Sequence, residues 1–141
     1  MRPQGKELTL HVDERGFFVE AWRASWGMDV KQVSHSRMYQ GVVKAWHWHR
    51  QQTDVWHVVR GVLLVALYHP VKHKLLTEIM SAGGTRVVRI PPGWWHGCKV
   101  LSGPCDLIYM TDYEYDGTDE FREPHDIDPP GYDWLKGAPI T

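Results

Sequence analysis

Two histidines one residue apart, in a stretch that alternates like a β-strand, constrain this chain more than any other feature. His47 and His49 lie between Gly41 and Gly61. Because side chains two apart on a strand share a face, both imidazoles should point the same way. A further histidine, His96, follows directly after the turn sequence Pro-Pro-Gly-Trp-Trp. The pattern predicts a β-strand with two imidazoles on one face and a third histidine after a turn.

The remainder of the chain also has the pattern of β structure. Turn sequences at 82–85 and 102–104 separate short runs rich in β-branched and aromatic residues. This pattern favours an all-β antiparallel sandwich or barrel with little helix, and a short turn at 120–124 is the best helical candidate. We expect strands at residues 17–19, 41–48, 55–68, 75–80, 86–90 and 107–110.

Composition bounds the class of protein. With 141 residues, 43% of them hydrophobic, a single domain spanning 1–141 is expected, with an extended tail from Pro124 packed by Tyr132 and Trp134. A net charge of −1 without basic runs argues against nucleic acid as a partner. No apolar run approaches the roughly eighteen residues of a membrane span, and no signal peptide is evident, so we expect a cytoplasmic protein. Cys98 and Cys105 lack CxxC spacing and are predicted to be free thiols.

Two phrases carry a resemblance to a known superfamily. Gly-x5-His-x-His-x4-Asp-x6-Gly, from Gly41 to Gly61, and Pro-x-Gly-x2-His, ending at His96, together resemble the paired signature of the cupins. Asp54 stands where that signature usually has Glu. The resemblance implies a jelly-roll barrel. It leaves the chemistry open, because such barrels host metal enzymes, metal-free sugar enzymes and binding modules.

A narrower resemblance extends over most of residues 13–129. The chain is similar to the dTDP-4-dehydrorhamnose 3,5-epimerase family, a metal-free branch of the cupins. The matching segments, in chain order, are residues 13–20 (D-x-R-G-x-F-x-E), 32–36 (Q-x-N-x-S), 41–47 (G-V-x-R-G-L-H) and 90–97 (I-P-x-G-F-A-H-G), followed by the tyrosines Tyr109 and Tyr115.

This resemblance implies chemistry on a nucleotide-linked 4-keto-6-deoxy sugar, without a metal or other cofactor. A ketone acidifies the hydrogens on its neighbouring carbons, so a neutral imidazole can remove one if the enolate oxygen is stabilised. At the matching positions, His47 would be the base and Tyr109 the acid. The residues implied to bind the substrate or the enolate are Arg15, Glu20, Gln32, Lys44, His49, His96 and Tyr115.

Three departures from the family pattern bear on the reaction. Lys44 replaces an arginine, and Asp54 stands near the place of a lysine. The family's aspartate that pairs with the base falls beyond Thr141 in this alignment of motifs. We therefore expect a single epimerisation or a shift of the keto group rather than a double epimerisation.

Three alternatives remain open. The His-x-His pair also resembles a phrase of the sugar-nucleotide 3,4-ketoisomerases, in which two histidines on one face serve adjacent carbons. A second alternative is a barrel that binds a nucleotide sugar without catalysis. In the third, His47, His49, Asp54 and His96 hold one divalent metal ion, because imidazoles and a carboxylate at this spacing suit Fe, Mn, Ni or Zn.

A homodimer is expected from the apolar surface. Trp46 and Trp48 alternate with the histidines, so they face away from them, toward another layer or a second subunit. Together with Trp22, Trp26 and the apolar N-terminal segment at 8–10, they are more than one small barrel should hide. In such a dimer the segment containing Arg15 and Glu20 would complete the partner's nucleotide site.

Overall fold

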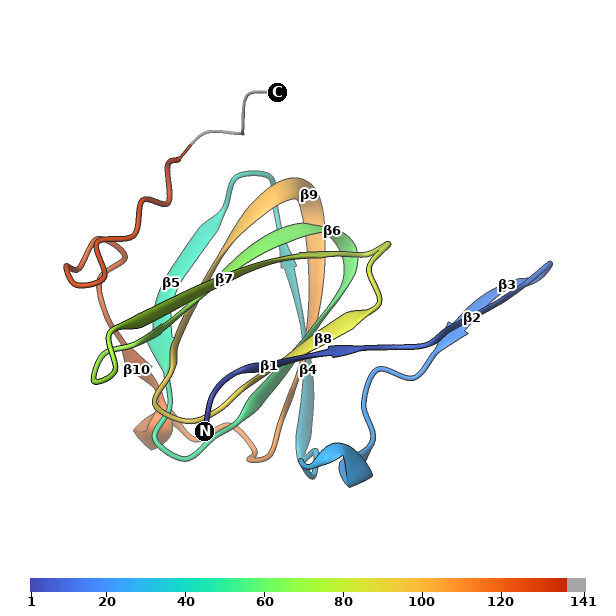
Figure 1. Ribbon diagram of the computed structural model, residues 1–141, viewed down its shortest axis with the longest axis horizontal. Helices are drawn as coiled ribbons and strands as arrows, with labels where there is room; N and C mark the ends of the chain where they lie inside the picture. The colour runs from blue at the N-terminus through green and yellow to red at the C-terminus, as the bar shows by residue number, and fades with distance from the viewer. Residues whose placement is uncertain (137–141) are drawn as a thin grey trace.

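Two unusually long strands organise the computed structural model, which describes residues 1–136 (Figure 1). The strands β6 (Asp54–His69) and β9 (Trp95–Thr111) pair antiparallel along nearly their whole length, with register shifts between residues 58 and 63. At this bend Gly61 has a φ of 80°, and a Cβ there would lie 2.5 Å from the carbonyl oxygen of Ser102. Only glycine therefore fits the bend, which lets each long strand contribute to two layers.

The two layers make an antiparallel jelly-roll barrel, as predicted. One layer joins the first half of β6 and the second half of β9 to β1 (Gln4–Glu7), β4 (Gln32–Met38) and β8 (Arg86–Ile90). The other joins their remaining halves to β5 (Val43–Trp48), β7 (Lys74–Ser81) and β10 (Phe121–Arg122). Within residues 1–136 there is no α-helix, and the helical turns are the 3-10 turns Ala24–Trp26 and Gly117–Asp119. None of the described helices has the length and apolar character needed to cross a membrane.

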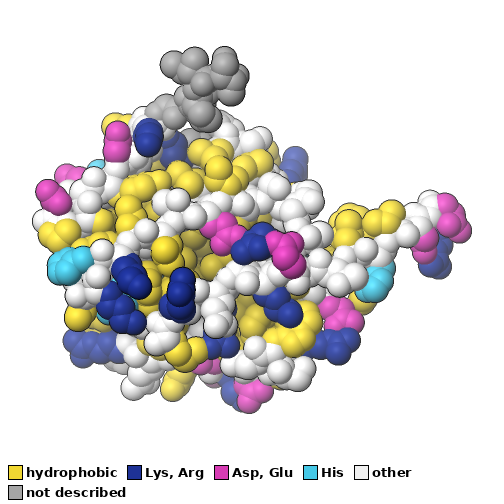
Figure 2. All heavy atoms as spheres, in the orientation of Figure 1, with side chains coloured by type: hydrophobic (Ala, Val, Ile, Leu, Met, Phe, Trp, Pro, Cys, Tyr) yellow, Lys and Arg dark blue, Asp and Glu magenta, His cyan; other side chains and the backbone are white. Residues whose placement is uncertain are grey.

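A hairpin of β2 (Leu10–Asp13) and β3 (Gly16–Val19) stands away from the barrel (Figures 1 and 2). Its two strands pair with each other and with no other described strand. Its large apolar side chains face solvent in the single chain: Val12 is 70% exposed, Phe17 66% and Phe18 62%. The molecule therefore has a buried apolar core in the barrel and a separate exposed apolar surface on the hairpin.

Several strand predictions need correction. The sequence 102–104 is not a turn but lies inside β9, opposite Gly61, so the predicted strand 107–110 is the end of a strand that begins at Trp95. The helical candidate at 120–124 is also wrong, because residues 121–122 form β10 and the helical turn precedes them. The strands β1, β2 and β4 were not expected. Their edges are defined by partners distant in sequence, and short local patterns do not show such pairing.

The aromatic residues near the tail are buried within the chain. Trp46 has no exposed surface and packs edge-on against Trp134 at 5.2 Å and Tyr132 at 6.3 Å between ring centres. The tail thus packs on the barrel as predicted, with residues 137–141 outside the described part of the chain. The expectation that the tryptophans leave excess apolar surface is wrong: Trp22 and Trp26 are half-buried against each other. The large exposed apolar side chains of the N-terminal segment are on the hairpin instead.

Candidate functional site

A pocket of about 360 Å³ lies inside the barrel, between the two layers. Its walls come from β4, β5, β6 and β9, and the segment 115–122 closes one side. Seven of the predicted site residues line it, together with Asp54. The seven are Gln32, Lys44, His47, His49, His96, Tyr109 and Tyr115.

The β5 strand positions its pocket residues through an irregularity. His47 and His49 both line the pocket, as alternation predicts, while Trp46 lies on the opposite face. Lys44 is three residues before His47, so strict alternation would place these two on opposite faces. A register shift between them, opposite β9, brings both into the pocket.

His47 is a half-buried imidazole with a carboxylate behind it. Its Nδ1 lies 3.8 Å from Oε1 of Glu120, and its ring stacks against His96 at 6.2 Å between centres. Burial lowers the pKa of His47, and the nearby Arg122 lowers it further, while Glu120 opposes both effects. His47 is consequently neutral at pH 7, the form that accepts a proton.

Glu120 and Arg122 were not anticipated from the sequence. Glu120 accepts hydrogen bonds from the Tyr115 hydroxyl and from Arg122 Nη2, each at 3.2 Å. Burial raises the pKa of Glu120, but the bonds from Arg122 and Tyr115 outweigh it, so the net pKa is lowered and the group is ionised. Both residues reach the site because β10 pairs with β5, Arg122 opposite His47. A two-residue strand carries no local signal for that pairing.

Tyr109 reaches the pocket from the other layer. It belongs to the half of β9 that pairs with β4, opposite Ser34, whereas His47 pairs with the other half. Nearby, Gln32 accepts a bond at 2.8 Å from the backbone N–H of Tyr115, and so anchors the segment that carries Glu120. The two candidate proton-transfer residues therefore enter the pocket from different walls.

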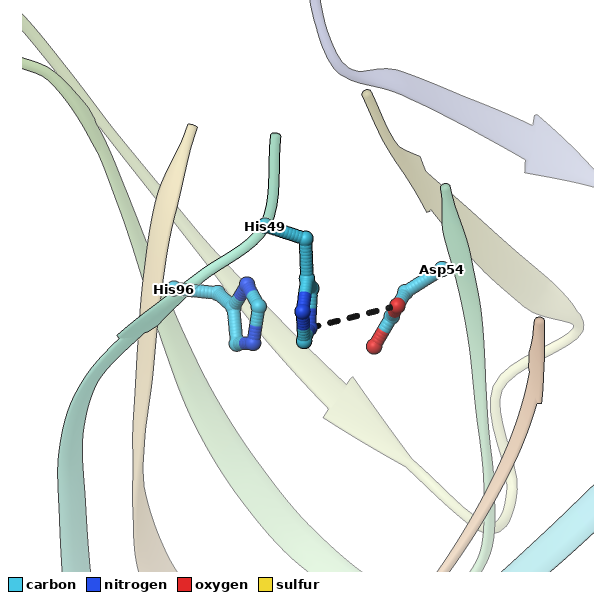
Figure 3. Close-up of side chains that lie close together, drawn as sticks. All are labelled: His49, Asp54 and His96. Atoms are coloured by element: carbon cyan, nitrogen blue, oxygen red, sulfur yellow. Dashed lines mark ion pairs between the residues drawn. The ribbon is translucent and has the colours of Figure 1, made fainter. Parts of the chain in front are cut away.

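The residues that could hold a metal ion are His49, Asp54 and His96 (Figure 3). One ligand atom from each lies within 4.8 Å of the others. His47 is not part of this group, so the four-residue ligand set considered from the sequence is corrected to three. His96 is buried, and burial is the main cause that lowers its pKa to about 4.

Arg15 and Glu20 do not line the pocket of their own chain. Arg15 pairs with Asp13 at the exposed tip of the hairpin, and Glu20 pairs with Arg23. Cys98 does line the pocket, but burial raises the pKa of its thiol to about 12, so it is not a nucleophile at neutral pH. Both cysteines are free, as predicted.

Comparison with known proteins agrees with this fold and site. The chain is 37% identical to the spore coat polysaccharide biosynthesis protein SpsL of Bacillus subtilis, over 92% of each protein. It is 34% identical to the probable low-salt glycan biosynthesis epimerase Agl13 of Haloferax volcanii, over 92% of this chain and 90% of that protein. Among solved structures, an RmlC 3,5-epimerase from Legionella pneumophila, in complex with dTDP-4-keto-L-rhamnose, is 27% identical with a TM-score of 0.85, over 99% of this chain and 81% of that one.

Fold and pocket together define a cupin-type barrel whose structural neighbours are dTDP-4-dehydrorhamnose 3,5-epimerases and related isomerases. The resemblance seen in the sequence is confirmed. The polysaccharide biosynthesis C-terminal domain family matches residues 11–115, and the chain belongs to that family.

Proposed function

We propose that this protein is an epimerase acting on a nucleotide-linked 4-keto-6-deoxy sugar. It would remove a proton from a carbon beside the ketone and return one to the opposite face of the ring. The observation that supports this most is the arrangement of His47, its carboxylate Glu120, and Tyr109 on a different wall of one pocket. The names of two similar proteins, an epimerase and a structure holding a dTDP-4-keto sugar, point to the same substrate class.

His47 is the proposed base. Its Nδ1 faces Glu120, so Nε2 is the nitrogen that takes the carbon-bound proton. The carboxylate holds the ring in position and stabilises the imidazolium that forms. Glu120 thus supplies, from β10, the orienting carboxylate that the motif comparison lacked.

Tyr109 is the proposed acid, delivering a proton from the other side of the pocket to complete the inversion. Lys44 is placed to stabilise the enolate, because its exposed ammonium forms no ion pair with a carboxylate within residues 1–136, and its one side-chain bond, 3.4 Å, is to Ser36. His96 stays neutral at pH 7 and adds no charge of its own. Gln32 and Tyr115 are proposed to contact the substrate at the rim.

Solvent exchange tests this function. The protein is incubated in deuterium oxide with candidate 4-keto-6-deoxy sugars linked to dTDP or UDP, and the label is located by NMR. We expect deuterium at C3 or C5. Label at one carbon indicates a single epimerisation, and label at both a double one. Binding of every candidate without exchange would contradict the proposal and indicate a non-catalytic barrel.

A second candidate function is 3,4-ketoisomerisation, favoured by one observation. His49 lines the same pocket as His47, so two imidazoles from one strand face a bound sugar. In this reaction the carbonyl itself moves from C4 to C3. The same NMR experiment distinguishes the two, because epimerisation leaves the carbonyl carbon at C4.

We further propose that the protein is a homodimer in which the hairpin docks on the second copy. A two-stranded hairpin is marginally stable alone in water, and this one exposes Val12, Phe17 and Phe18. Docking would bury these side chains and carry Arg15 and Glu20 toward the partner's pocket, as the resemblance implies. Arg15 is suited to a diphosphate because its guanidinium binds phosphate oxygens in pairs.

Light scattering tests the assembly. We expect a mass near twice 16.4 kDa for the wild type and near 16.4 kDa for the Phe17→Ser, Phe18→Ser double variant. If Arg15 serves the partner, the double variant also binds dTDP more weakly. A wild-type monomer at micromolar concentration, with full nucleotide binding, would contradict the dimer.

A further inference from the structure

The group formed by His49, Asp54 and His96 presents ligand atoms that converge from three separate segments (Figure 3). His49 follows the end of β5, Asp54 begins β6, and His96 lies near the start of β9. The side chains of His49 and Asp54 are 14% and 6% exposed, and His96 is buried. The group lies at the inner end of the pocket wall that also carries His47.

The hydrogen bonds of His49 define which of its nitrogens is free. Its Nδ1 lies 2.7 Å from the carbonyl oxygen of Asp119, an acceptor, so Nδ1 carries the proton. The lone pair is then on Nε2, which faces Oδ1 of Asp54 at 3.8 Å. Two electron-rich atoms thus face each other, with only the amide of Gln52 donating weakly to Nε2 at 3.4 Å and to Oδ1 at 2.8 Å. A cation bound here satisfies both.

The surroundings fix these ligands as the surroundings of metal sites do. Metal-binding histidines usually donate their other N–H to a carbonyl or carboxylate, as His49 does to Asp119. The carboxylate is held from both sides, Oδ2 by the indole N–H of Trp56 at 3.1 Å and Oδ1 by Gln52. His96 adds a buried Nδ1 without a hydrogen-bond partner. The negative charge of Asp54 is therefore placed among neutral donors and two imidazoles rather than beside Lys or Arg.

We infer that His49, Asp54 and His96 bind one divalent first-row transition-metal ion. Two imidazoles and one carboxylate are a ligand set that suits such ions and leaves coordination positions open. The site also explains the substitution of Asp54 near a lysine position of the 3,5-epimerases, because a bound ion restores the positive charge that this lysine would bring.

The role of the ion rests on the proposed function. When bound, it would act as a Lewis acid toward the ketone or enolate oxygen, and His47 would remain the base because it lies outside the ligand set. The presence of the site itself rests on the geometry alone.

Metal binding by the full-length protein tests the site. Protein purified without an affinity tag is treated with EDTA, then titrated with Co²⁺ and with Zn²⁺, following visible absorption and heat. We expect one ion per chain. Asp54→Asn and His49→Gln should each weaken binding by at least ~100-fold, since loss of a direct ligand costs no less than loss of its supporting partner. The two substitutions provide independent variants should one fail to fold, with circular dichroism as the check.

Two control variants make the result specific. His35→Gln alters a different histidine–aspartate pair, on the outside of the barrel, and His47→Asn alters the neighbouring imidazole. Both should retain one ion per chain. No binding by the wild type, or equal binding by Asp54→Asn, would overturn the site.

The same samples separate this inference from the proposed function. Solvent exchange by metal-free protein that binds no ion would overturn the metal site and leave epimerisation standing. Metal binding lost in Asp54→Asn, with no exchange by the loaded wild type on any candidate sugar, would support the site and contradict epimerisation.

Discussion

Two histidine–aspartate pairs, one on each face of the barrel wall, are held in very different ways. Outside, His35 Nε2 lies 2.8 Å from Asp106, whose two oxygens also accept bonds from Arg37 at 2.8 and 2.9 Å. Inside, His49 and Asp54 stand 3.8 Å apart, and the carboxylate receives its bonds from uncharged groups. The outer pair is complete, whereas the inner pair has room and charge for a further group.

The difference teaches that residue type alone does not identify a site. Both pairs join neighbouring strands, and both aspartates are buried. What separates them is the partner: a guanidinium balances Asp106, and no Lys or Arg forms an ion pair with Asp54 within residues 1–136. An uncompensated buried charge is costly, so proteins retain it mainly where it binds something.

The largest effect is expected from removing the base on the inner face. Asn in place of His47 keeps a hydrogen-bonding side chain but cannot accept the proton, so solvent exchange into the substrate should fall by about 10²–10⁴-fold. His35→Asn, on the outer face, is the matched control and should exchange at the wild-type rate. Undiminished exchange in His47→Asn, measured by NMR, would remove His47 from the mechanism and with it the contrast between the two faces.

Tyr109 should separate exchange from inversion. Phe at this position leaves His47 able to remove and return a proton on its own side, so deuterium still enters the sugar. Delivery from the other wall is lost, and net inversion should fall by about 10²-fold, within the range of a general acid. The measurement is the ratio of label to inverted product. A parallel fall of both would assign Tyr109 a structural role.

Glu120 and Arg122 should shift the pH dependence in opposite directions. The rate falls as pH drops through the pKa of His47, because only the neutral ring accepts a proton. Glu120 raises this pKa and Arg122 lowers it, so the acidic limb should move to lower pH in Glu120→Gln and to higher pH in Arg122→Gln. Glu120→Gln should also slow exchange by about 10–100-fold, as loss of an orienting partner does. Limbs that do not move would show that neither charge acts on His47.

Most of the inner face could be predicted from the sequence because strand alternation and motif spacing are local. His47, His49 and His96 are linked by short spacings, and all three line the pocket. Glu120 could not be predicted in this way. It reaches His47 through a two-residue strand paired with β5, more than seventy positions away in the sequence, and such a short strand has no periodicity to read.

The hairpin shows the opposite limit. Its motif matched the 3,5-epimerases in sequence, yet Arg15 and Glu20 lie outside the pocket of their own chain. A local pattern specifies the hairpin but not the surface on which it docks. The long β9 strand was divided for a related reason: Gly103 and Pro104 signal a turn locally, whereas the pairing with β6 makes them a bend within a strand.

The smallest effect is expected from the outer pair, and it concerns stability. Hydrogen bonds from Arg37 and His35 hold the pKa of Asp106 well below its usual range. In the unfolded chain this carboxyl titrates near its ordinary pKa, about 3.9, so its stabilising contribution is complete above that pH and is lost as pH falls toward the folded value. Asp106→Asn should therefore have a lower free energy of unfolding than the wild type at pH 7, with the gap narrowing below about pH 4. Urea unfolding at pH 7 and pH 3.5 measures both gaps, and a gap that stays constant would show that the charge of Asp106 contributes nothing to stability.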